Sequence, residues 1–122
     1  MSNETLYARL GGYDAIAAVT NAVYPLMQSD EKLRRFWDHR GADGIEREKQ
    51  LLIDFLCTAA GGPLLYTGRD MTTVHKGMRI DADDWERLVG HLTQTLGNFN
   101  VPERERGEVL ALAQGTRQEI VE

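Results

Sequence analysis

His75 is the residue whose type and neighbours point most directly to chemistry. Met71, Val74 and Met78 accompany it at helical spacing, which would place its imidazole on the apolar side of a short helix. A histidine in such a place is most often a core residue with a hydrogen-bonded ring. The alternative is a metal ligand, because a neutral imidazole binds iron through one ring nitrogen while a hydrogen bond fixes the other. Taken alone, the residue leaves both interpretations open.

Three aromatic side chains are the next candidates. Tyr24 falls near the inner edge of an expected helix, and a buried tyrosine needs a partner for its hydroxyl. That partner is either a backbone carbonyl or a ligand in a pocket. Phe36 and Trp37 precede a polar loop, so they are either ordinary core residues or a wedge against a flat ring.

Other kinds of site have little support in the sequence. The three histidines are far apart, and the single cysteine, Cys57, can form neither a usual structural zinc site nor an internal disulfide. Cys57 lies among apolar residues and is expected to be inert packing. The aspartates that begin at Asp81 are typical of a helix cap, since the remaining ligand spacing of a calcium loop is absent.

Length and composition indicate one globular domain over residues 1–122, with 42% hydrophobic residues. The formal net charge of -5 argues against nucleic acid as the main partner. No apolar run is long enough to span a membrane, and the first residues lack the features of a signal peptide. Together with the lone cysteine, this predicts a reduced, cytoplasmic protein.

Apolar residues recur at helical spacing almost everywhere, which predicts an all-α domain with four substantial helices and several short ones. Thr5 is expected to cap a first short helix, and the second begins at Asp14, with Pro25 kinking it or starting a new segment. Residues 39–44 are expected to be a loop. The clearest helix spans 45–60, Asp81 caps another, and one last helix carries residues 109–120. The expected buried face of the helix over 45–60 consists of Leu51, Leu52, Phe55, Leu56 and Ala59.

Short motifs follow one another along the chain in a specific order and spacing. They are Leu6-Tyr7-Ala8-Arg9-Leu10-Gly11-Gly12, Tyr24, Phe36-Trp37, Phe55-Leu56, Gly61-Gly62-Pro63, Tyr66-Thr67-Gly68-Arg69-Asp70-Met71, Val74-His75-Lys76-Gly77-Met78, Gly90-His91-Leu92 and Val101-Pro102-Glu103. In these motifs the sequence resembles the truncated haemoglobins, in particular type I (N), from Thr5 to about Val121.

The resemblance implies a two-over-two helical sandwich around haem b (iron protoporphyrin IX). His75 matches the proximal iron ligand, and Tyr24 matches the distal tyrosine that donates a hydrogen bond to bound oxygen. Trp37 stands where the family usually has a phenylalanine on the ring. The haem contacts implied by the match are Phe36, Trp37, Leu52, Phe55, Tyr66, Met71, Val74, Ile80, Trp85 and Leu88. The candidates for contact with the propionates are Arg69, Lys76 and Arg79.

The helix on the distal side departs from the family pattern. Counted back from the paired glycines, the usual distal glutamine position holds Leu52, the position one turn earlier holds Glu48, and Gln50 is two residues short. Either Tyr24 is the single donor, or the helix shifts in register so that Gln50 points inward. No histidine stands on this helix to cap the iron, so a five-coordinate ferrous haem is expected without external ligand.

The resemblance implies reversible binding of oxygen or another diatomic gas, such as nitric oxide or carbon monoxide. An alternative is nitric oxide dioxygenation, for which a separate reductase would have to supply electrons, since the sequence contains no flavin or nicotinamide domain. Periodicity alone also permits a helical binding module without a cofactor.

Overall fold

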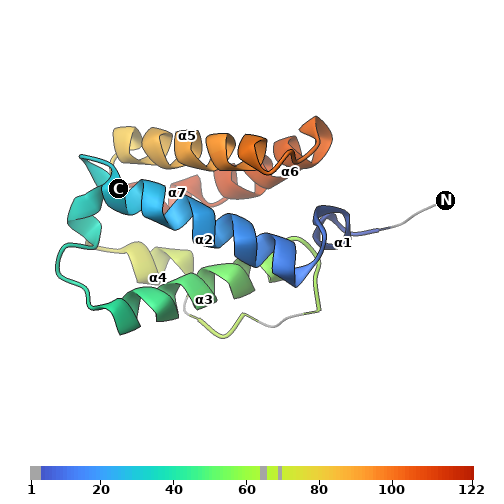
Figure 1. Cartoon of the computed structure of the whole chain (residues 1–122). Helices are drawn as coiled ribbons and strands as arrows, with labels where there is room; N and C mark the ends of the chain where they lie inside the picture. Colours follow the sequence, from blue (N-terminus) through green and yellow to red (C-terminus); the bar gives the residue numbers. More distant parts are fainter. Residues whose placement is uncertain (1–3, 64–65, 69) are drawn as a thin grey trace.

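A computed structural model describes residues 4–63, 66–68 and 70–122, which form α-helices, one 3-10 helix and the turns between them (Figure 1). In chain order the elements are α1 (Leu6–Leu10), α2 (Tyr13–Ser29), η1 (Leu33–Phe36), α3 (Ala42–Ala59), α4 (Met71–His75), α5 (Ala82–Asn98), α6 (Glu103–Gln114) and α7 (Arg117–Ile120). Four of them are long, as the periodicity predicts. Within the described ranges, no helix has both the length and the apolar character needed to cross a bilayer.

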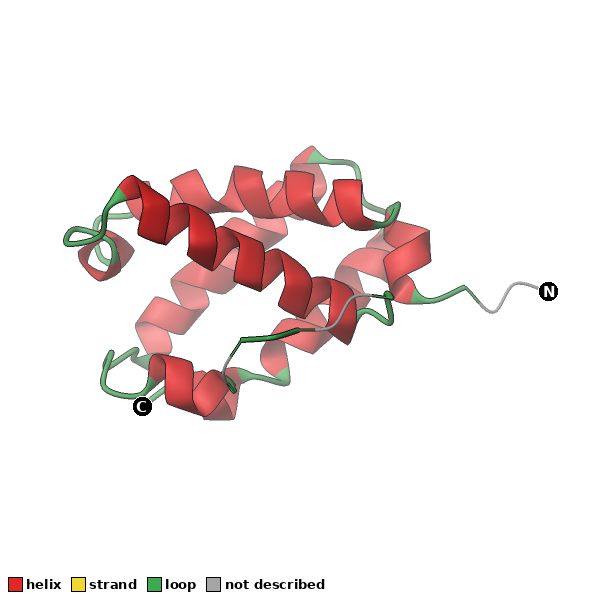
Figure 2. Ribbon diagram, turned by 90° about the horizontal axis from the view of Figure 1, so that it is seen from below, coloured by secondary structure: helices red, strands yellow, loops and turns green. Residues whose placement is uncertain are grey.

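The long helices form two pairs. α2 packs against α3, α5 packs against α6, and α2 also contacts α5. Figure 1 shows α5 and α6 along the top, α2 across the middle and α3 with α4 below, and Figure 2 shows the same arrangement from below. The short helix α4 contacts α7 near the end of the chain.

Side-chain caps fix two helix starts where the sequence predicts them. The Thr5 hydroxyl accepts a hydrogen bond from the Ala8 backbone N–H at 3.1 Å. Asp81 and Asp84 form a reciprocal capping box, in which each carboxylate accepts from the other residue's backbone N–H. These bonds satisfy N–H groups that the first turn of a helix leaves unpaired.

Two predicted boundaries are wrong. α3 begins at Ala42, inside the expected loop, because its exposed first turn carries only the small Ala42 as an apolar residue and gives no signal of a helix. The last helix is two helices, α6 and α7, and between them the Thr116 hydroxyl donates to the Ala113 carbonyl at 2.7 Å. α2 begins at Tyr13, one residue before the predicted start, and runs through Pro25 as one helix, which excludes a new segment there and leaves the kink as a prediction.

Burial also differs from the predicted pattern on α3. Ala59 is exposed, although it belongs to the predicted buried face. On α3 the fully buried side chains are Ile53 and Cys57, in keeping with the inert packing expected for the cysteine. The leucines and Phe55 of the predicted face are only half-buried, because they line a cavity.

A buried carboxylate joins η1 to the start of α5. Asp84 is 1% exposed and accepts two hydrogen bonds from Arg35, at 3.0 and 2.6 Å, with Lys32 at 3.4 Å. Burial acts to raise the pKa of Asp84, but Arg35, the Asp81 N–H and Lys32 outweigh it and lower the pKa to about 2. The network holds η1, and therefore Phe36, against α5.

We expect Asp84→Asn to lower the free energy of unfolding by about 2 kcal/mol at neutral pH. The folded pKa lies below the unfolded value, so this stability is fully present above pH ~4 and is lost as pH falls towards 2. Urea unfolding across this range should show a flatter pH dependence in the variant. Asp83→Asn is the control, because the Asp83 side chain is 61% exposed. Equal losses in the two variants would contradict the assignment.

Candidate functional site

A cavity of about 690 Å³ lies between the helix pairs and is walled mainly by apolar side chains of α2, η1, α3, α4 and α5. The predicted haem contacts that line it are Phe36, Trp37, Leu52, Phe55, Tyr66, Met71, Ile80, Trp85 and Leu88. His75 and Tyr24 line it as well. The side chain of Val74 lies outside the described part of the structure. The cavity is within the size range of cofactor pockets and brings the sequence-predicted residues together.

The imidazole of His75 is oriented by its own helix. Its Nδ1 lies 2.8 Å from the backbone carbonyl oxygen of Met71, one turn earlier in α4. A carbonyl oxygen only accepts, so in the neutral imidazole Nδ1 carries the hydrogen and Nε2 has the lone pair. This is the arrangement that an imidazole metal ligand requires.

The short α4 is held at both ends. The Asp70 side chain accepts from the Thr73 N–H, and Gly77 leaves the helix with a φ of 85°, a conformation that favours glycine. The Gly77 N–H then donates to the Glu122 carboxylate at 2.6 Å, and the Glu122 N–H donates to the Ile80 carbonyl at 2.8 Å. The end of the chain thus fixes the loop that follows His75.

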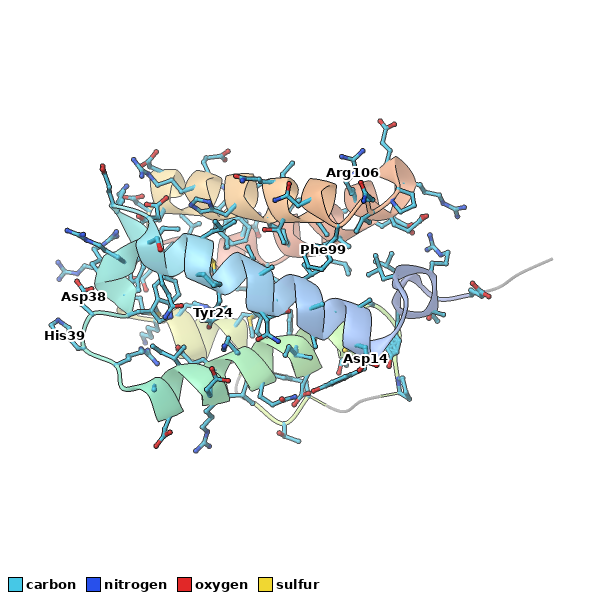
Figure 3. The ribbon with its side chains drawn as sticks, in the orientation of Figure 1. Asp14, Tyr24, Asp38, His39, Phe99 and Arg106 are labelled. Atoms are coloured by element: carbon cyan, nitrogen blue, oxygen red, sulfur yellow. The ribbon has the colours of Figure 1, made fainter. Side chains whose placement is uncertain are left out.

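Tyr24 reaches the cavity from α2 and is 6% exposed (Figure 3). Its ring meets that of Trp37 edge-on, with centroids 5.8 Å apart. Burial, followed by the negative charge of Glu48, raises the pKa of Tyr24 well above its ordinary value, while Trp37 and the charge of Arg40 oppose the rise. The Tyr24 hydroxyl therefore keeps its hydrogen at neutral pH and can donate it.

The structure resolves the open question on the distal helix. Gln50 is exposed and donates to the Tyr13 hydroxyl at 2.8 Å and to Asp54 at 3.0 Å. It does not line the cavity, whereas Leu52 and Glu48 do. The helix therefore keeps the register counted from the paired glycines, and the cavity receives a carboxylate in place of an amide.

The basic residues in the cavity lining differ from the three propionate candidates. Lys76 and Arg79 are exposed and do not belong to the lining, and Arg69 lies outside the described residues, so their contact with the propionates stays a prediction. The lining includes Arg40, in the loop before α3, and Arg47, on α3. The sequence did not point to these two, because a basic residue in a polar loop or on an exposed part of a helix carries no signal of a site.

A smaller cavity of about 170 Å³ adjoins the first and has only apolar side chains in its lining. Both cavities are lined by Val19, Leu56, Leu92, Leu112 and Ala113. Phe99, labelled in Figure 3, belongs to the smaller cavity and is partly exposed. The two cavities therefore lie on either side of a wall of five shared apolar side chains.

The residues fit a haem group by this geometry. The apolar walls suit a flat macrocycle, Nε2 of His75 is available as a ligand atom, and Arg47 would supply positive charge for a propionate. Arg40, also in the lining, is paired with Glu48 at 2.6 Å. Tyr24 supplies a buried donor in the same space.

Comparison with known proteins agrees with this fit. The bacterial-like globin family matches residues 5–122. A group 1 truncated haemoglobin of Tetrahymena pyriformis is 28% identical over 97% of this chain and 95% of its own length. Another, from Mycolicibacterium paratuberculosis, is 32% identical over 87% of this chain and 76% of its own length.

Solved structures show the same fold. The truncated haemoglobin of Tetrahymena pyriformis in its Fe(III) form superposes with a TM-score of 0.88, at 27% identity over 97% of this chain and 98% of that one. The 2/2 haemoglobin of Synechococcus, in the cyanomet state with covalently attached haem, gives 0.83 at 26% identity over 95% and 94%. The predicted two-over-two sandwich is confirmed, and the chain belongs to the bacterial-like globins as a truncated haemoglobin of group 1.

Proposed function

We propose that this globin reversibly binds oxygen or another diatomic gas at haem b, with His75 as the axial ligand. The observation that carries the proposal is the 2.8 Å contact between His75 Nδ1 and the Met71 carbonyl, which leaves Nε2 free at the 690 Å³ apolar cavity. His75 is the one histidine in the described lining of that cavity, which supports five-coordination without external ligand.

Each residue has a distinct part in the mechanism. When bound, haem would supply a ferrous iron able to bind a diatomic gas, and His75 would hold that iron. The Met71 carbonyl holds the His75 ring in one tautomer and orientation. Phe36, Leu52 and their apolar neighbours exclude water. Tyr24 keeps its phenolic hydrogen because its pKa is raised, and donates it towards the polar ligand.

Repeated gas exchange tests reversibility. The reduced protein should take up oxygen in air and release it under nitrogen over several cycles, as followed by its visible spectrum. Complete oxidation in the first cycle would contradict reversible binding. Nitric oxide dioxygenation would use the same pocket with a separate electron donor, and it stays a prediction.

The shared wall of the two cavities predicts a change in ligand entry. We propose that gas passes between the two cavities past Ala113, which lines both. Ala113→Phe places a ring there and should slow carbon monoxide association several-fold after flash photolysis. Ala111→Phe is the matched control on the exposed side of α6. Unchanged association in both variants would mean that gas enters elsewhere.

A further inference from the structure

The chain leaves α4 through a type II turn that begins at His75. Lys76 has φ -59° and ψ 130°, and Gly77 has φ 85°. The Met78 N–H closes the turn by donating to the His75 carbonyl at 3.1 Å. A type II turn offers no acceptor to the N–H of its third residue, here Gly77. Arg79 then has φ 56°, which residues other than glycine rarely adopt, so the backbone after His75 is strained and needs contacts from outside to hold it.

Glu122 supplies those contacts at both ends of the strained segment. Its carboxylate accepts from the Gly77 N–H at 2.6 Å, and its own backbone N–H donates to the Ile80 carbonyl at 2.8 Å. The residues between these two bonds include Arg79. Since hydrogen bonds to a charged acceptor are stronger than those to a neutral one, the carboxylate is the firmer of the two ties.

Apolar packing brings Glu122 to this place. Ile120, the last residue of α7, is buried in a cluster with Ile80 and Trp85. These three side chains also line the larger cavity, and α7 contacts α4 directly. The position of Glu122 is therefore set by the same packing that forms the wall of the cavity near His75.

We propose that Glu122 is a positioning residue for the axial histidine, because it holds the turn after His75 in one conformation and so fixes the direction in which the imidazole meets the iron. The inference rests on the proposed haem function. The Met71 carbonyl fixes the rotation of the ring, whereas Glu122 fixes the backbone on which α4 ends. Water can replace the carboxylate as an acceptor for Gly77, but water does not tie the turn to α7.

Glu122→Ala removes the tie, and Glu122→Gln keeps a neutral acceptor in the same place. In the ferrous holoprotein without external ligand, we expect the iron–histidine stretching band of the resonance Raman spectrum to broaden in Glu122→Ala, because several ring orientations then coexist. The band should sharpen again in Glu122→Gln. Haemin transfer to a competing apoglobin should be several-fold faster in Glu122→Ala. Glu119→Ala is the matched control, since Glu119 is exposed on the same short helix.

A double-mutant cycle shows whether Glu122 acts through the turn. Gly77→Ala strains the turn itself, because alanine is unfavourable at a φ of 85°. The effects of Gly77→Ala and Glu122→Ala on haemin loss should therefore be less than additive in the double variant. Additive effects would overturn the proposal. An unchanged stretching band in Glu122→Ala, or a band equally broad in Glu122→Gln, would overturn it as well.

Hydrogen exchange in the apoprotein separates this proposal from the haem function. The Gly77 amide should exchange faster in Glu122→Ala than in the wild type, while the Trp85 amide in the core stays equally protected. Equal Gly77 exchange in the two proteins would mean that Glu122 does not hold the turn. A wild type that takes up no haemin is a different result, which would refute the proposed function itself.

Discussion

Replacement of His75 by glycine should abolish tight, stoichiometric haemin binding, and added imidazole should restore it. The variant removes His75, the proposed iron ligand and the one histidine among the described residues that line the cavity, and leaves a space into which free imidazole fits. We expect the sharp Soret band of the wild type to be lost and to return with millimolar imidazole. Absorption spectra during haemin titration, with and without imidazole, measure this directly.

The exposed His39, outside the cavity lining, provides the control. His39→Gly should bind haemin as the wild type does. Circular dichroism establishes that each variant is still helical before its spectrum is interpreted. A His75→Gly protein that binds haemin normally without imidazole would contradict the assigned ligand.

The second large effect is expected on oxygen release. Tyr24→Phe keeps the ring packed on Trp37 but removes the buried hydroxyl. Oxygen should then dissociate about tenfold faster, because the loss of one hydrogen bond to the bound oxygen costs roughly 1.4 kcal/mol. Carbon monoxide dissociation should change much less, because carbon monoxide is a weaker acceptor. Stopped-flow displacement of each gas gives both rates.

Tyr13→Phe is the matched control, since the Tyr13 hydroxyl accepts from Gln50 outside the cavity. Because the pKa of Tyr24 is raised, its hydroxyl stays protonated and the wild-type oxygen dissociation rate should be flat from pH 6 to 9. Equal oxygen rates in wild type and Tyr24→Phe would remove the tyrosine from the mechanism.

The sequence was sufficient to predict features that depend on one helix alone, such as its cap or the spacing of its apolar residues. Thr5 and Asp81 cap the helices predicted from them, and the spacing around His75 places its ring at the cavity. The start of α3 was missed because its first turn is exposed and polar, so no apolar period marks it.

Features that depend on contacts between different helices and loops could not be predicted from the sequence. The sequence does not show whether Gln50 or Glu48 faces the cavity, because the register of α3 against α2 decides it. The hydrogen bond between Gln50 and Tyr13 joins those two helices. The same holds for Arg40, whose approach to Glu48 requires the fold of the loop between η1 and α3.

Haem binding by this chain is tested most directly by a haemin titration of the wild-type apoprotein, followed by reduction and addition of carbon monoxide. We expect saturation at one haemin per chain, a sharp Soret band, and a clear shift of that band with carbon monoxide. Unsaturable haemin binding with a broad band that carbon monoxide leaves unchanged would contradict it and favour a helical module without a cofactor.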